Sequence, residues 1–154
     1  EVAYRARWRG FYPSNLAGPL DAWNQAASLE QTFFLDGPER SVFVGYRFDD
    51  DSGTHRAGDA YSYDGNEVDA GLRFAFPKLR AQTTLAYRYR NESFNSASDG
   101  RHDHENALSF QLREALLPPH LFLTLEYFGT FHDSNQPQFA YNRDIGSVGL
   151  EVTF

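Results

Sequence analysis

The segment Gly146–Phe154 constrains the fold of this chain more than any other, because its side chains alternate between two characters. Four apolar residues recur at every second position: Val148, Leu150, Val152 and Phe154. The residues between them, Ser147, Gly149, Glu151 and Thr153, are small or polar. Period-two alternation predicts a β-strand with one apolar and one polar face.

The same alternation recurs upstream and predicts seven further strands. They are Val2–Tyr12, Trp23–Leu35, Val42–Phe48, Val68–Phe76, Ala81–Arg90, Ala107–Arg113 and Leu121–Phe131. Short turn signals stand at Asp36–Glu39, Pro77-Lys78 and Pro118-Pro119. No stretch has a helical period. We therefore expect an all-β fold of eight antiparallel strands in a single domain, residues 1–154.

The predicted connections alternate in length. Long polar loops follow every odd-numbered strand, at Pro13–Asp21, Asp49–Glu67, Asn91–Glu105 and His132–Arg143, and short turns follow the even ones. Transmembrane β-barrels show this asymmetry, with short periplasmic turns and long outer loops. A mean hydropathy of −0.58 is compatible with this, since a barrel strand needs only about ten residues, half of them polar. The pattern predicts a transmembrane β-barrel in a bacterial outer membrane.

Aromatic residues make up 16% of the chain, and on the predicted lipid face they gather at the two strand ends. The girdle expected near the long loops comprises Trp8, Tyr12, Trp23, Tyr46, Tyr87, Tyr89, Tyr127 and Phe131. Phe154 belongs to the opposite girdle. Such belts are typical of membrane interfaces. The alternative is a soluble lipocalin-like barrel with the same alternation turned inside out.

The opposite face is predicted to carry a network of charges. Its members are Arg5, Arg7, Arg9, Glu30, Arg47, Asp69, Arg73, Arg88, Arg90, Arg113, Glu126 and Glu151. In a closed eight-stranded barrel the charges must pair with one another and form a plug, because unpaired buried charge is costly. In a wider barrel the same residues would line water, and the arginine excess would favour anions.

Composition excludes several functions. The net charge of −7 argues against nucleic acid as a partner, and the absence of cysteine excludes disulfides and thiolate metal sites. We expect no cofactor and no metal. Asp49, Asp50, Asp51, Asp59 and Asp64 form a carboxylate cluster without a calcium-loop pattern, and His102 and His104 fall in a predicted loop. No signal peptide is visible, so either it has been removed or this is a fragment.

The tail from His132 carries a further pattern. Ser134-Asn135, Phe139, Tyr141, Asn142 and Arg143 precede the last strand. Together with Tyr63-Asp64 and Tyr87–Arg90, this resembles bacterial outer-membrane barrels of the surface lipoprotein assembly modulator and repeat-linked porin type. The resemblance implies a barrel and no particular substrate, and several such barrels have more than eight strands. The closing strand also resembles the signal read by the barrel assembly machinery, at Val148, Leu150, Val152 and Phe154.

One pattern points to an enzyme. His132-x-Ser134-Asn135 resembles the active-site strand of outer-membrane lipid A deacylases, in which a serine is the nucleophile and a histidine its base. Asp144 is the candidate for the acid. The rest of the chain shows no such likeness, and Asp-Ser-Asn is ordinary loop sequence.

The expected function is therefore non-enzymatic: a structural, surface-interaction or assembly protein of the outer membrane. Its expected partners are outer-membrane lipid and lipopolysaccharide, the assembly machinery and further protein chains. The alternative is a part of a larger porin or exporter barrel that transports solutes, polysaccharide or lipoprotein. Pairing between the first and last strands of this chain would distinguish the two.

Overall fold

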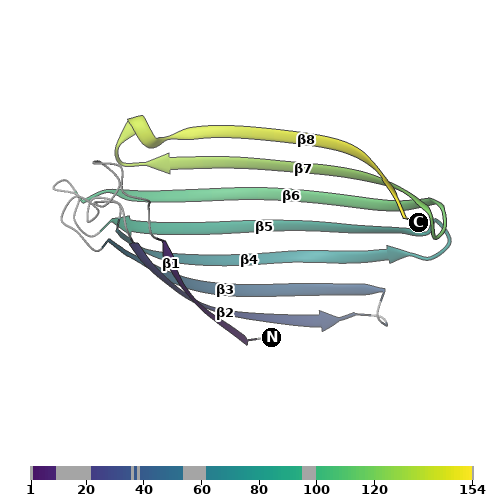
Figure 1. Cartoon of the computed structure of the whole chain (residues 1–154), viewed down its shortest axis with the longest axis horizontal. Helices are drawn as coiled ribbons and strands as arrows, with labels where there is room; N and C mark the ends of the chain where they lie inside the picture. The colour runs from purple at the N-terminus through teal and green to yellow at the C-terminus, as the bar shows by residue number, and fades with distance from the viewer. Residues whose placement is uncertain are drawn as a thin grey trace.

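The computed structural model describes residues 2–9, 22–35, 37, 39–53, 62–94 and 100–153. Eight strands form one antiparallel sheet in chain order (Figure 1). They are β1 (Val2–Arg9), β2 (Ala22–Phe34), β3 (Arg40–Gly53), β4 (Tyr63–Phe76), β5 (Ala81–Phe94), β6 (His102–Leu117), β7 (Leu121–Ser134) and β8 (Tyr141–Val152). A 3-10 turn, η2 (Pro137–Phe139), precedes β8. The all-β class and the antiparallel strand order are confirmed.

The strands extend further than their apolar alternation indicates. β3 continues to Gly53, β4 begins at Tyr63, and β5 ends at Phe94. β6 begins at His102 and β7 ends at Ser134. The loops expected at Asp49–Glu67, Asn91–Glu105 and His132–Arg143 are therefore too long. Backbone pairing continues where both faces are polar, because ladder hydrogen bonds do not require apolar side chains. The predicted loop Pro13–Asp21, Tyr12 and Phe154 lie outside the described residues.

The sheet does not close on itself. Within the described part of the chain, β1 pairs with β2 and β8 pairs with β7, and β1 and β8 form no ladder with each other. β1 is also short: Val2 lies opposite Leu29, so the β2 segment Gln31–Phe34 extends beyond it. A barrel closed by these eight strands is therefore not observed.

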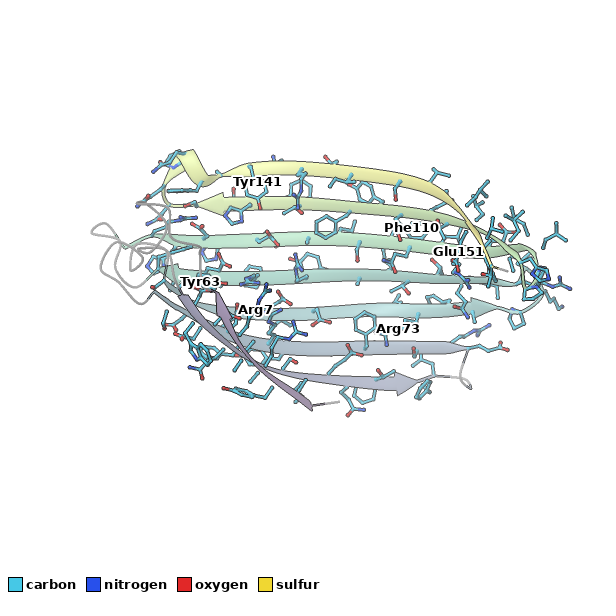
Figure 2. The ribbon with its side chains drawn as sticks, in the orientation of Figure 1. Arg7, Tyr63, Arg73, Phe110, Tyr141 and Glu151 are labelled. Carbon is cyan, nitrogen blue, oxygen red and sulfur yellow. The ribbon has the colours of Figure 1, made fainter. Side chains whose placement is uncertain are left out.

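Cross-strand register divides the side chains between two faces. The charged face includes Arg47 of β3, which lies opposite Glu67 of β4, which in turn lies opposite Arg90 of β5. The apolar face includes Tyr46 of β3, opposite Val68 of β4. Figure 2 shows side chains projecting from the sheet along its length. The division agrees with the predicted alternation on every strand.

The apolar face is exposed. Leu85, Leu108 and Val148 have 42%, 40% and 75% of their surface exposed. Residues that lie opposite one another across the sheet form rows. On the apolar face, the rows from Leu29 to Phe33 of β2 form an apolar band, in which the only charged side chain among the described residues is that of Asp144. From Leu85 to Tyr89, at about 3.3 Å per residue, this band runs roughly 13 Å along β5.

No helix in the described ranges has the length and the apolar character needed to cross a membrane.

Candidate functional site

The predicted charge network lies on one face of the sheet. Arg88 of β5 is opposite Asp69 of β4, and Arg113 of β6 is opposite Gln82 of β5. Arg5 and Arg7 occupy the same face on β1, opposite Ala26 and Asn24. Arg9 has the corresponding register position, opposite Ala22, and its side chain is outside the described set, as are those of Val2 and Trp8.

Four members of the network form two ion pairs in the half of the face nearer the short turns. Arg73 Nη2 lies 3.4 Å from Glu30 Oε1, and Arg113 Nη2 lies 3.1 Å from Glu151 Oε1. The four side chains are each more than 40% exposed. Ion pairs this exposed contribute little to stability, about 0–1 kcal/mol each. They leave this half of the charged face in contact with water.

Glu126 and Asp69 have other surroundings. Glu126 Oε2 accepts a hydrogen bond from Ser147 Oγ at 3.3 Å. Asp69 lies over Gly45 of the neighbouring strand, where an added Cβ would come within 2.2 Å of Asp69 Oδ1. A side chain at position 45 would force the Asp69 carboxylate out of this position.

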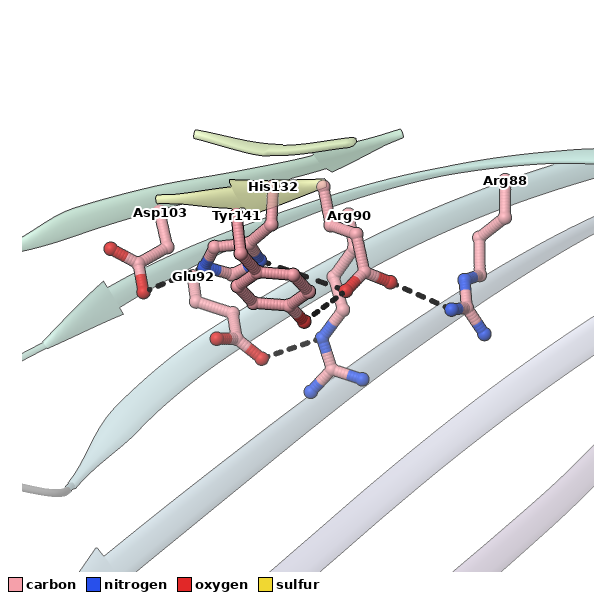
Figure 3. Close-up of a pocket in the computed structure, with 7 residues that line it drawn as sticks. Arg88, Arg90, Glu92, Asp103, His132 and Tyr141 are labelled. Carbon is pink, nitrogen blue, oxygen red and sulfur yellow. Dashed lines mark hydrogen bonds and ion pairs between the residues drawn. The ribbon is translucent and has the colours of Figure 1, made fainter. Parts of the chain in front are cut away.

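The densest group of charges lies near the long-loop end. We call it the Arg90 cluster and define it by the residues that line a cavity of about 340 Å³: Arg88, Arg90, Glu92, Asp103, Glu105, His132 and Tyr141. They come from four neighbouring strands, β5 to β8 (Figure 3). Only Arg88 and Arg90 were predicted as members of the charge network.

Arg90 is the centre of this group. Its Nε lies 2.7 Å from Glu92 Oε1, its Nη2 lies 3.0 Å from Asp49 Oδ2, and its Nη1 lies 3.5 Å from Glu67 Oε2. Asp49 is 1% exposed, and Tyr63 Oη also donates to it at 3.2 Å. A guanidinium with five donors is suited to hold several carboxylates at once.

Asp103 is a second centre and is likewise 1% exposed. His132 Nε2 lies 3.2 Å from Asp103 Oδ2, and the Arg101 guanidinium donates to both carboxylate oxygens. His132 in turn stacks on Tyr141, with ring centroids 4.7 Å apart, and Tyr141 Oη donates to Glu105 Oε2 at 3.4 Å. These contacts join β6, β7 and β8 on the charged face.

Two carboxyl groups here have displaced pKa values. Both lie between the apolar band and the long-loop end of the sheet. The residues beside them in sequence, which face the apolar side, are all polar there: Asn91, Ser93, His102 and His104. Burial raises the pKa of Glu92, and the pull of Arg90 only partly offsets it. Burial also acts to raise the pKa of Asp103, but hydrogen bonds, first from Arg101 and then from Ser134, outweigh it and the pKa is lowered.

Arg101 contacts both the end of β5 and the 3-10 turn η2. Its guanidinium lies 4.0 Å from the ring centre of Phe94 and 3.6 Å from that of Phe139 in η2. The Asn135 side chain donates to Gly100 O at 2.9 Å and accepts from His102 N at 2.9 Å. Asn135 and Phe139, which carry the resemblance noted in the sequence, therefore fasten the β7–β8 connection to the start of β6.

The catalytic group expected for a lipid A deacylase is not assembled. Asp144 lies on the apolar face, where its Oδ1 accepts a hydrogen bond from Tyr127 Oη at 2.7 Å. His132 and Ser134 lie on the charged face and both bond Asp103. A serine nucleophile needs the order Ser–His–Asp, with the histidine in the middle. Here the aspartate is in the middle.

The other predicted sites separate cleanly between the faces. The girdle residues Trp23, Tyr46, Tyr87, Tyr89, Tyr127 and Phe131 are all exposed on the apolar face, as are Val148, Leu150 and Val152. Among the described residues, no group of three or more His, Asp or Glu side chains is arranged to hold a metal ion. Asp59 of the predicted carboxylate cluster lies outside that set.

Sequence reasoning missed five carboxylates of the charged face: Asp49, Glu67, Glu92, Asp103 and Glu105. They were assigned to loops because the apolar alternation had ended. Extending the two-residue alternation of each strand past its last apolar residue would have identified them, since Asp49 follows Arg47 and Glu92 follows Arg90 at a spacing of two. The arginine excess expected on this face is therefore compensated.

Comparison with known proteins gave no match to a protein-family model, a curated protein or a solved structure.

Proposed function

We propose that this chain forms part of the wall of an outer-membrane β-barrel wider than its own eight strands, and that the barrel gives polar solutes passage across the membrane. The observation that carries the proposal is the lack of a β1–β8 ladder in the described residues. Both sheet edges are open, and an open edge inside a bilayer would leave backbone groups unsatisfied. Further strands must therefore complete the barrel.

The apolar face supports placement in a membrane. Large exposed apolar patches are rare on soluble proteins and mark contact surfaces. Five outward tyrosines also share a direction: Tyr4, Tyr46, Tyr87, Tyr89 and Tyr127 each bond a polar side chain nearer the long-loop end, namely Gln25, Asn66, Asn106, His104 and Asp144. For Tyr4, Tyr46 and Tyr89 the hydroxyl points out of the apolar band, which matches the wet edge of a bilayer, whereas the partners of Tyr87 and Tyr127 lie within the band.

The charged face supports a water-filled interior. Exposed ion pairs such as Arg73–Glu30 would suffer a large desolvation cost in a dry plug. Surrounded by water, they are tolerated. The second candidate is a closed structural barrel, favoured by the dense pairing within the Arg90 cluster.

Cysteine crosslinking tests the proposal, because the chain has no cysteine of its own. Ala6→Cys on β1 is combined in turn with Gly146→Cys, Val148→Cys and Leu150→Cys on β8, all on the apolar face. The control pair, Leu125→Cys with Val148→Cys, joins residues directly opposite in the sheet and should crosslink rapidly. We expect no intrachain β1–β8 crosslink in the membrane-inserted protein.

A β1–β8 crosslink that forms as fast as the control would contradict the wider barrel. Planar-bilayer conductance adds a second readout. Steady single-channel steps are expected from a wide wet lumen, whereas a closed, plugged barrel gives none.

A further inference from the structure

The cavity of the Arg90 cluster combines compensated charge with unfilled hydrogen-bonding positions. Arg88 Nη2 lies 2.7 Å from Glu105 Oε1, and Arg90 Nε lies 2.7 Å from Glu92 Oε1. Asp103 is held by Arg101 and His132. A charged ligand of either sign would have to displace one of these partners, so the cavity favours a neutral ligand.

Two polar atoms at its walls remain without a hydrogen-bond partner. His132 Nδ1 lies 3.6 Å from the nearest carboxylate oxygen, Glu105 Oε2, which is too far for a hydrogen bond. Arg88 Nε is a donor whose nearest carboxylate oxygen lies outside the cavity lining, at 3.9 Å. Arg88 Nε and His132 Nδ1 are both buried without a hydrogen-bond partner in the described structure.

Hydroxyl groups can satisfy both atoms. A hydroxyl accepts a hydrogen bond from Arg88 Nε, and because a hydroxyl both donates and accepts, a second one can bond His132 Nδ1 whichever ring nitrogen carries the proton. Tyr141 supplies an apolar surface beside them: one ring face stacks on His132, and the side chain is 44% exposed. Such a ring offers packing for the C–H face of a cyclic polyol.

We propose that this cavity binds a small neutral polyhydroxylated solute of monosaccharide size. The inference rests on the proposed function only for access, because the charged face must border water for the solute to reach it. Binding itself is measured on the detergent-solubilised chain and requires neither closure nor conduction.

Saturation-transfer NMR tests the proposal with three probes of matched size: glucose, the anionic glucuronate and the cationic glucosamine. We expect transfer to glucose at millimolar concentrations. For the charged analogues we expect roughly tenfold weaker binding, since one displaced ion-pair partner corresponds to about a tenfold change.

Variants locate the site. Tyr141→Ala should abolish transfer to glucose, whereas Tyr141→Phe keeps the ring and should retain it. Tyr46→Ala is the matched control, since Tyr46 is similarly exposed, at 46%, but lies on the apolar face. Circular dichroism of each variant checks that the sheet persists.

Equal transfer to all three probes, or unchanged transfer in folded Tyr141→Ala, would overturn the inference. No transfer at all would also overturn it, and would mean that Arg88 Nε and His132 Nδ1 bond ordered water only. Either result can coexist with a conducting barrel, so the loss of this inference is distinguishable from the loss of the proposed function.

Discussion

Tyr127 Oη donates a hydrogen bond to Asp144 Oδ1 across Gly129, at 2.7 Å, on the apolar face of the sheet. Gly129 lies opposite Asp144 on the neighbouring strand, and a Cβ there would come within 2.7 Å of Tyr127 Oη. The glycine therefore provides the space through which the tyrosine reaches its partner.

Gly129→Ala should weaken this contact. The methyl group displaces the Tyr127 hydroxyl. We expect the unfolding free energy to fall by about 1 kcal/mol, the net contribution of one hydrogen bond whose partners can bond water instead. Urea unfolding in detergent micelles measures it. Gly146→Ala is the control, because nothing lies within 4 Å of its added Cβ. Equal losses in the two variants would show that the Tyr127–Asp144 contact is not responsible.

Asp103 should be the most sensitive carboxylate of the charged face. Asp103→Asn leaves the half-buried Arg101 and His132 without their charged partner on the buried Asp103, and breaking a buried pair costs about 3–5 kcal/mol. Asp133→Asn, an exposed neighbour on the apolar side, should change stability by less than about 0.5 kcal/mol. Thermal unfolding followed by circular dichroism compares the two. Similar melting temperatures would contradict the role of Asp103 as a structural centre.

The contribution of Asp103 should also appear in the pH dependence of the unfolding free energy. A lowered pKa in the folded state means that the ionised Asp103 stabilises the fold above its unfolded-state pKa, and that this contribution is lost as the pH falls through the folded value. We expect the stability difference between the native chain and Asp103→Asn to shrink progressively below about pH 4, the ordinary aspartate range. A difference that is constant down to pH 2 would exclude this linkage.

Much of the fold could be predicted from period-two alternation alone. The strand order, the assignment of Arg47, Arg88 and Arg90 to one face, and that of Tyr46 and Tyr89 to the other are all correct. Strand ends could not be predicted in this way, because Asp49 and Asp103 continue a ladder whose two faces are both polar. Closure could not be predicted either, since pairing between distant strand edges depends on register and curvature, which alternation does not encode.

The candidate site depended on those unpredicted ends. Sequence reasoning singled out His132 and Ser134 and, for the enzyme alternative, offered Asp144 as the acid. The alternation of side chains puts Asp144 on the apolar face, where it bonds Tyr127. The carboxylate that His132 contacts is instead Asp103 of β6. Long-range pairing partners of this kind come from the register between strands, which a single sequence does not supply.

The Arg101 sandwich should control how firmly the β7–β8 connection is held. Arg101→Lys keeps the positive charge but lacks the flat guanidinium that stacks between Phe94 and Phe139. We expect faster limited proteolysis within residues 135–140, by several-fold, with the sheet intact. Arg80→Lys in the short turn after β4 is the control. Unchanged cleavage in Arg101→Lys would mean that Asn135 alone fastens the connection.

Adjacent residues on β5 test the membrane placement of the two faces. In a chain whose Trp8 and Trp23 are replaced by phenylalanine, Leu85→Trp places a single indole on the apolar face, and Thr84→Trp places it on the charged face. If the apolar face meets lipid, brominated acyl chains should quench Leu85→Trp strongly, and its emission should be blue-shifted. If the charged face borders water, Thr84→Trp, one residue away, should be quenched instead by aqueous acrylamide. In the same membrane placement, Tyr89→Trp should be quenched by bromines near the headgroup more than by those near the bilayer centre, since the Tyr89 hydroxyl points toward His104 at the long-loop end. Equal lipid quenching at positions 84 and 85 would be incompatible with a sheet that separates lipid from water.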